Sequence, residues 1–219
     1  MGHRLRSLRP PLVFLTLMVI MSGAIYPGLI TEFAQYVVPG SANGSLITGP
    51  NGTVIGSELL GQNITCNPAA YPNVSECPFR GLFWSRPSLT DYQSILGAGN
   101  ETPYNPTNPA LRNQTLALYN QTIYYMQLYG VNNITVPIDQ VSESESGLDP
   151  DLLPQAALVQ VYRVAYFANQ SGLTNITIGA LTNLVDANID NFADGYIGVP
   201  YVNVVQLDIA LLHLEGVAT

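Results

Sequence analysis

The sequence predicts an α+β protein in which a single N-terminal transmembrane helix precedes one mixed α/β domain. Three observations lead to this prediction. Residues 10–31 contain no charged side chain. The rest of the chain alternates between short β-like runs and longer helical stretches, and it contains no visible repeat of 20–50 residues. A length of 219 residues accommodates an anchor and one domain, and excludes a long multidomain protein.

The anchor is predicted over residues 10–31, because a helix needs about 20 apolar residues to cross the hydrocarbon of a bilayer. Three arginines within residues 1–9 precede this run, and Glu32 follows it. This asymmetry predicts a cytoplasmic N-terminus and an extracytoplasmic domain over residues 32–219. Pro27 and Gly28 predict a kink or an early exit near the far end of the helix.

A cleaved signal peptide is the alternative interpretation of the same segment. A basic start, an apolar run from Pro11 to Met21 and the small residues Ser22, Gly23 and Ala24 fit that pattern. Apolar residues continue beyond these small residues, which favours a retained helix. In a retained helix the same three residues are candidates for close packing against a neighbouring membrane helix. The domain leaves the cytoplasm under both interpretations.

Composition excludes several classes of function. All 7 basic residues are arginine, and 15 acidic residues give a net charge of −8. Without lysine the chain has no P-loop and no Schiff-base chemistry. An acidic domain does not attract a phosphate backbone, so nucleic acid is not an expected partner. His213 is the only histidine outside the N-terminal segment, which argues against a Ser-His-Asp triad.

Cysteines and sequons both agree with an exterior domain. Cys66 and Cys77 are the only cysteines, and a disulfide is expected in an oxidising compartment. A metal site would need further ligands, which no nearby histidine supplies. Asn-x-Ser/Thr triplets are possible glycan acceptors, although an Asn-, Ser- and Thr-rich chain also forms them by chance. Ten occur, at Asn43, Asn51, Asn63, Asn73, Asn100, Asn113, Asn120, Asn133, Asn169 and Asn175.

The exterior domain is predicted to open with a β-hairpin. Runs of β-forming residues at 45–47 and 53–55 flank the turn signal at residues 49–52. Residues 58–62 are expected to begin a short helix. Residues 63–110 are rich in Pro, Asn and Gly, which predicts loops whose aromatic side chains pack onto the core.

Helices are expected in the second half of the domain, with two further strands. Gln160 and Arg163 are the inner polar pair of the middle helix, because residues three apart share one helix face. The helices are predicted over residues 108–129, 154–170 and 177–188, and the strands over 135–138 and 201–207.

Five carboxylates within 13 residues are the one chemically suggestive cluster. Such a cluster could bind a hard cation or supply an acid/base pair as in glycosidases. Its spacing fits neither an EF-hand nor a fixed catalytic pattern. This favours an acidic turn in which Asp149-Pro150-Asp151 places negative charge at the start of the next helix. The cluster comprises Asp139, Glu143, Glu145, Asp149 and Asp151.

Several segments occur in an order that points to one family. They are LRPPLVFLTLMVIMSGAIYPGLIT, GSLITGPNGTVIGSELLGQN, FWSRPS, GAGNETPYNPTNPAL, VPIDQVSESESGLDP followed by AALVQVYRVA, and GVPYVNVVQLDIALL. Over roughly residues 8–212 the chain resembles the C subunit of the Kdp-type potassium-transporting ATPase. The combination of RPS, SGLDP and GxPxVNV is specific, although none of these motifs carries a mechanism alone.

The resemblance implies a single-pass cell-membrane subunit of a high-affinity, ATP-driven potassium importer. The implied subunit is accessory and non-catalytic, and it stabilises its partners. These are a channel-like potassium-binding subunit, a P-type ATPase subunit and a small helical subunit. ATP and potassium act in the complex, and no cofactor is expected on this chain.

The family is also described as a catalytic chaperone that raises the affinity of the ATPase subunit for ATP. A glutamine in its LIGQ-like motif, which corresponds to Gln62, is suggested to contact nucleotide. Two departures from the family stand out. The segment with both cysteines looks like an insertion, and Glu145 stands where the family has glycine.

Two other functions remain as alternatives. The first is a secreted or membrane-anchored surface glycoprotein that binds a ligand or scaffold, and the second is a two-carboxylate glycosidase. Absence of lysine, abundant Tyr and Asn and an isoelectric point near 4.4 lead to a separate hypothesis, that the chain faces an acidic exterior, because carboxylates with ordinary pKa values are partly neutral there.

Overall fold

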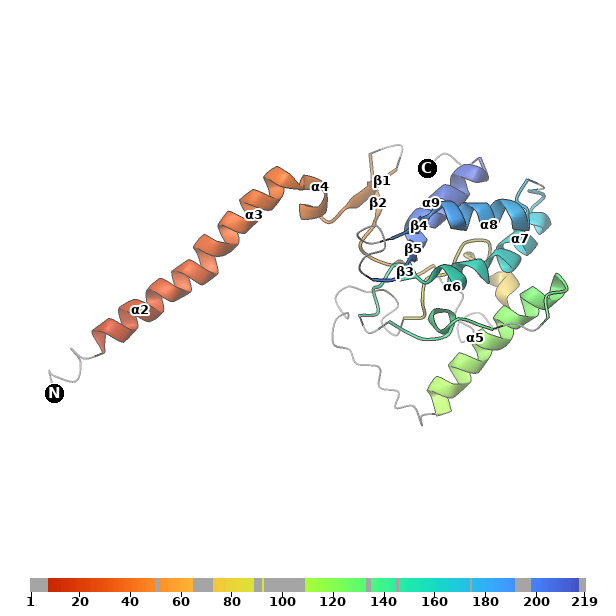
Figure 1. Cartoon of the computed structure of the whole chain (residues 1–219), viewed down its shortest axis with the longest axis horizontal. Coiled ribbons are helices and arrows are strands. Elements are labelled where there is room, and N and C mark those ends of the chain that lie inside the picture. The colour runs from red at the N-terminus through yellow and green to blue at the C-terminus, as the bar shows by residue number, and fades with distance from the viewer. Residues whose placement is uncertain are drawn as a thin grey trace. The chain divides into compact units, whose positions relative to one another are not determined.

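The computed structural model contains a helical N-terminal unit, Met1–Leu46, and a mixed α/β unit, Ile47–Thr219 (Figure 1). This agrees with the predicted fold class. The structure describes residues 8–49, 52–64, 73–88, 92, 109–132, 135–144, 146–173, 175–191 and 198–216.

The N-terminal unit is built on one continuous helix, Arg9–Val37, which is long and apolar enough to cross a membrane. The predicted span over residues 10–31 lies inside it. The helix comprises α2 (Arg9–Ile20), the π turn η1 (Met21–Ile25) and α3 (Tyr26–Val37), and a short helix, α4 (Pro39–Ala42), follows it. None of the residues of this helix is buried.

Proline explains the π turn. Pro27 has no N–H, and its ring crowds the carbonyl group four residues earlier. The backbone widens just before it, so that the Tyr26 amide donates to the carbonyl of Met21, five residues back. Ser22 Oγ also donates to the carbonyl of Met18, at 2.6 Å. The helix does not end at Pro27 but continues to Val37.

The described residues from Leu46 onward form two small sheets. Strands β1 (Leu46–Thr48) and β2 (Val54–Ser57) pair with each other, which confirms the hairpin. The other sheet is antiparallel, with strand order β3-β5-β4. Its register places Asp151 opposite Asn203 and Asp190 opposite Tyr201, so polar residues gather at the strand ends. Its strands are β3 (Asp151–Leu152), β4 (Ile189–Asp190) and β5 (Tyr201–Asn203).

The described part of this unit also contains helices and two short 3-10 turns. The helices are α5 (Pro109–Leu128), α6 (Pro154–Leu158), α7 (Val161–Gln170), α8 (Ile178–Ala187) and α9 (Val204–Leu214), and the turns are η2 (Val74–Glu76) and η3 (Ile138–Gln140). Helix α8 contacts α6, α7 and α9, and α5 lies against α7. The core between them includes Phe83, Leu152, Val164, Leu181, Val202, Leu207 and Leu211.

The helix predicted over residues 108–129 is confirmed as α5, and the one over 177–188 as α8, where the Thr177 side chain accepts from the Ala180 amide. The helix predicted over 154–170 is divided into α6 and α7. The interruption lies at Gln160, whose side-chain amide makes tertiary hydrogen bonds to a distant loop.

Three other local predictions were wrong. Residues 135–138 form no strand, and Ile138 begins η3. Residues 58–62 form a turn in which Leu60 bridges to Ser57, not a helix. The strand predicted over 201–207 ends at Asn203, whose Oδ1 accepts from the amides of Val205 and Gln206 and thereby caps α9.

Candidate functional site: an arginine hub beside an acidic groove

A buried network fixes the loop that leads to Arg86. The Gln160 side chain accepts from the amide of Trp84 at 2.7 Å and donates to its carbonyl at 2.9 Å. Arg163 donates to Gln160 Oε1 at 2.8 Å, which confirms the predicted polar pair. Its guanidinium also stacks over the Trp84 ring, 3.6 Å from the centroid. The loop is therefore held to α7 through both polar and aromatic contacts.

Asp208 holds the same loop from α9. Its Oδ1 accepts from the Phe83 amide at 2.8 Å, while Oδ2 has no hydrogen-bond partner in the described part of the chain. Burial raises the pKa of Asp208 well above its usual range, and the Phe83 amide and the charge of Arg163 oppose this shift. Burial also lowers the pKa of Arg163 to about 9.

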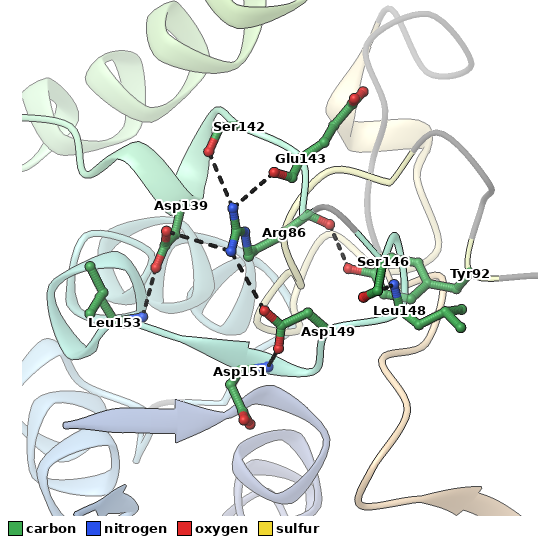
Figure 2. Close-up of polar contacts among 10 residues, drawn as sticks. All are labelled: Arg86, Tyr92, Asp139, Ser142, Glu143, Ser146, Leu148, Asp149, Asp151 and Leu153. Atoms are coloured by element: carbon green, nitrogen blue, oxygen red, sulfur yellow. Dashed lines mark hydrogen bonds and ion pairs between the residues drawn. The ribbon is translucent and has the colours of Figure 1, made fainter. Parts of the chain in front are cut away.

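Arg86 is the centre of the polar contacts in Figure 2. Its Nη1 lies 3.5 Å from Asp149 Oδ2 and 4.0 Å from Asp139 Oδ1. Its Nη2 donates to the carbonyl of Glu143 at 2.8 Å. The side chain is only 20% exposed. One guanidinium therefore holds Asp139, Glu143 and Asp149 together, and we call this arrangement the hub.

Beside this hub the SGLDP turn is hydrogen-bonded to three other segments that carry the family resemblance, those that contain Gly61, Ser88 and Val204. These bonds run from Ser88 Oγ to the Gly147 carbonyl, from the Gly61 amide to the Leu148 carbonyl and from the Val204 amide to the Pro150 carbonyl, at 2.8, 2.8 and 2.9 Å.

Tyr92 packs beside the hub and explains one glycine. Its Oη donates to the Arg86 carbonyl at 2.5 Å, and burial raises its pKa above the ordinary range. A Cβ at Gly61 would lie 2.2 Å from the Tyr92 ring. Position 61 therefore requires glycine because the ring occupies the space of a side chain.

An open groove of about 630 Å³ lies next to the hub. Asn203 Nδ2 donates to Asp151 Oδ1 at 3.1 Å, and Tyr201 Oη donates to Asp190 Oδ2 at 3.2 Å. Burial, followed by the charge of Asp149, raises the pKa of Asp151. The polar lining includes Glu58, Asp149, Asp151, Asn188, Asp190, Tyr201, Asn203 and Gln206.

The structure disperses the predicted acidic cluster. Asp149 and Asp151 line the groove, whereas Asp139 accepts from the Leu153 amide at 2.9 Å, where α6 begins. Glu143 faces α5, accepts from the Gln114 side chain at 3.2 Å, and has its pKa raised by burial. Glu145 lies outside the described residues. The carboxylate that contacts the start of α6 is therefore Asp139, and the prediction that Asp149-Pro150-Asp151 supplies this charge was wrong.

No metal site is found in the described part of the chain, where no three His, Cys, Asp or Glu side chains lie close enough to hold an ion. Cys77 is buried and disulfide-bonded. Its expected partner, Cys66, lies outside the described residues. Ser22, Gly23 and Ala24 lie in the π turn, and a Cβ at Gly23 would meet open space.

Gln62 makes intramolecular contacts. Its Nε2 donates to the Ile55 carbonyl at 3.3 Å. A Cβ at Gly56 would lie 1.9 Å from this nitrogen. The Gln62 side chain therefore lies across strand β2 at a place where the sequence provides the smallest residue.

Sequence reasoning did not identify the central role of Arg86, nor the groove residues Glu58 and Asp190. The Arg-Pro-Ser motif was the sequence feature that pointed to Arg86. In a chain with few arginines and many carboxylates, a guanidinium is expected to pair with carboxylates. Glu58 and Asp190 are far from the cluster in sequence. The β3-β5-β4 pairing brings Asp190 to the groove, and the Asn203 side chain holds Glu58 there by donating to its carbonyl at 2.7 Å.

Comparison with known proteins identifies relatives over nearly the whole chain. The family model KdpC, "K+-transporting ATPase, c chain", matches residues 8–213. The Potassium-transporting ATPase KdpC subunit of Geobacter sulfurreducens is 35% identical over 210 residues, covering 94% of this chain and 97% of the relative. The KdpC subunit of Methylococcus capsulatus is 36% identical, with coverage of 93% and 95%. That of Burkholderia cenocepacia is 37% identical, with coverage of 93% and 94%.

Proposed function

The chain belongs to the KdpC family, the c chain of K+-transporting ATPases, and from this membership we propose that it is the accessory, non-catalytic subunit of an ATP-driven potassium importer. In this role it assembles with a channel-like potassium-binding subunit, a P-type ATPase subunit and a small helical subunit. The observation that carries the proposal is the match over residues 8–213, which includes both the helix and the folded unit.

The proposed topology has a cytoplasmic N-terminus and an exterior domain. Arginine precedes the helix and Glu32 lies within its far half, in accord with the positive-inside bias. Ser22, Gly23 and Ala24 let another helix approach closely, because small residues bring backbones together where lipid offers no hydrophobic gain. The π turn supports this assignment, since a Cβ added at Gly23 would meet open space among the residues that the structure describes.

The groove is proposed to act on cations through its field. Glu58, Asp149, Asp151 and Asp190 would raise the local cation concentration near the entrance of the channel-like subunit. Salt screens such a field over about 8–10 Å. A field of this kind does not distinguish potassium from sodium, so selectivity belongs to the pore of the partner.

Gln62 is proposed to influence the affinity of the ATPase subunit for ATP without contacting the nucleotide. The amide is occupied by the Ile55 carbonyl, and the proposed topology places it away from cytoplasmic nucleotide. Its contribution would be to hold strand β2 and the following Gly61 segment against the hub, through which the domain contacts its partners.

Co-purification tests the proposed assembly. A tagged full-length chain extracted from its native membranes should carry the channel-like and ATPase subunits, and Gly23→Leu should lose them while still folding. Ala34→Leu, a small-to-large change farther along the same helix, is the matched control and should retain them. A wild-type chain that purifies alone, from cells whose potassium uptake survives its deletion, would contradict the proposal.

A further inference from the structure

The sequons are too numerous to follow from composition. The chain has 18 asparagines and 28 serines and threonines among 219 residues. Random placement would therefore give about two Asn-x-Ser/Thr triplets in which x is not proline, whereas ten occur. They extend from Asn43 to Asn175, and no internal repeat accounts for them. The excess indicates selection of the triplet itself.

All half-buried asparagines in the described part of the chain lie outside sequons, although Asn132, Asn183 and Asn191 are exposed asparagines that also lie outside them. The half-buried Asn188 and Asn203 lie outside any sequon, and both have structural roles. Asn188 donates to the Leu184 carbonyl at 2.8 Å, while Asn203 caps α9 and binds Asp151. By contrast, every described sequon asparagine is exposed. These are Asn43, Asn63, Asn73, Asn113, Asn120, Asn169 and Asn175.

Three of the exposed asparagines also have uncommitted amides. Asn113 and Asn120 lie on α5 and Asn169 near the end of α7. Their side chains make no hydrogen bond in the described part of the chain, whereas Asn175, for example, donates to the Leu214 carbonyl at 3.2 Å. A transferase could therefore modify these three without breaking a contact of the folded domain.

The α5 pair shares one helix face. Asn113 and Asn120 are seven residues apart, about two helical turns. Between and beyond them the same face exposes Leu116 and Tyr124, which are 43% and 54% exposed. A bulky polar group on each asparagine would cover these apolar side chains, which otherwise face water.

We infer that Asn113, Asn120 and Asn169 are N-glycosylated. This inference rests on the proposed function, because glycan transfer requires the domain outside the cytoplasm. The co-reactant is a lipid-phosphate-linked oligosaccharide. The asparagine Nδ2 attacks the anomeric C1, the C1–N bond forms, the C1–O bond to phosphate breaks, one amide proton leaves, and the lipid phosphate is released. The transfer is a substitution at C1, so it needs no oxidant or reductant.

Mass spectrometry of the full-length chain from its native membranes tests the inference. The intact chain should exceed the 23.6 kDa of its sequence, and peptides containing Asn113, Asn120 and Asn169 should each carry a glycan. The triple variant N113Q/N120Q/N169Q should lose these increments. Asn183→Gln, which changes an exposed asparagine outside any sequon, should leave the mass of the glycans unchanged.

A second set of variants identifies the type of modification. Thr115→Ala and Ser171→Ala keep Asn113 and Asn169 but remove their sequons, so each should lose one glycan. Unmodified peptides at all three asparagines would overturn the inference. External protease on intact spheroplasts separates the two proposals: an accessible but unmodified domain refutes glycosylation alone, whereas a protected domain refutes the topology of the proposed function.

Discussion

At the scale of single residues, Arg86 is the side chain with the largest number of polar partners at the hub. Its charge balances Asp149 and Asp139, and it holds the carbonyl of Glu143. Replacement by an apolar side chain of similar length removes the hydrogen bond to the Glu143 carbonyl, which is worth about 2 kcal/mol because the donor is charged. The two ion pairs, at 3.5 and 4.0 Å, add little to this loss.

Arg86→Met should therefore lower the free energy of unfolding by about 2 kcal/mol. The measurement is urea denaturation of the full chain in detergent, followed by the fluorescence of Trp84, the only tryptophan. Arg112→Met is the matched control, because Arg112 lies on the exposed face of α5 and has no hydrogen-bond or ion-pair partner in the described part of the chain. Equal effects of the two variants would argue against the hub.

Raised carboxyl pKa values predict greater stability in acid. Burial raises the pKa of Asp208, Glu143, Asp151 and Glu215 in the folded chain. The folded state thus retains protons that the unfolded chain releases near pH 4. Since stability falls with rising pH wherever the folded state binds more protons, the free energy of unfolding should decrease from about pH 4 toward pH 7.

Asp208→Asn should flatten this dependence, because asparagine keeps an oxygen for the Phe83 amide and does not ionise. Denaturation curves at several pH values would measure the change, with the exposed Asp186→Asn as a control that preserves the wild-type slope. Stability that rises between pH 4 and 7 would contradict the prediction. The expected direction also fits the acidic exterior inferred from composition.

At the scale of elements, strand β2 and Gln62 act together. A side chain at Gly56 would displace Gln62 Nε2 from the Ile55 carbonyl. Gly56→Ala and Gln62→Ala should therefore change the apparent affinity of the assembled ATPase for ATP by the same factor, and the double variant should add nothing further. ATPase assays would measure this, with the exposed Val54→Ala on the same strand as control. Wild-type affinity in both single variants would make Gln62 a packing residue only.

Sequence periodicity predicted some elements well, but it failed where tertiary contacts determine the ends of an element. Helices α5 and α8 have long helical patterns, and their bounds agree within one residue of the prediction. The division between α6 and α7 was not visible, because it depends on the contact of Gln160 with a loop 76 residues away in sequence. Helix α9 begins in a β-branched run that reads as a strand. Asn203 as a cap was its one local signal.

The candidate site was predictable only in part for the same reason. Asp149 and Asp151 were recognised from their spacing, and both line the groove. Their neighbour Asp190 comes from β4, which β5 joins to β3. The pairing of β3 with β5 connects residues 52 apart in sequence, which no local pattern encodes. Clustering in sequence wrongly included Glu143 in the site, because its side chain contacts Gln114 of α5 and does not line the groove.

At the scale of the whole molecule, the groove should affect transport without affecting assembly. Neutralising Glu58, Asp151 and Asp190 by amide substitution should leave the complex intact and weaken potassium uptake mainly at low potassium and low ionic strength, because salt screens the field. Uptake by intact cells over a range of ionic strength is the measurement. Asp186→Asn, an exposed charge change outside the groove, is the control. Loss of uptake that is insensitive to salt would assign these residues to packing.

The π turn rotates all later side chains of the long helix around the helix axis. One added residue in a helix of 3.6 residues per turn advances the later side chains by about 100° around the axis. The row of side chains that continues Leu12 and Val19 along a regular helix therefore emerges on another flank after Ile25. A straight neighbouring helix meets one row before the turn and a different one after it. The chain can thus present two separate faces to two neighbours within a single crossing of the bilayer.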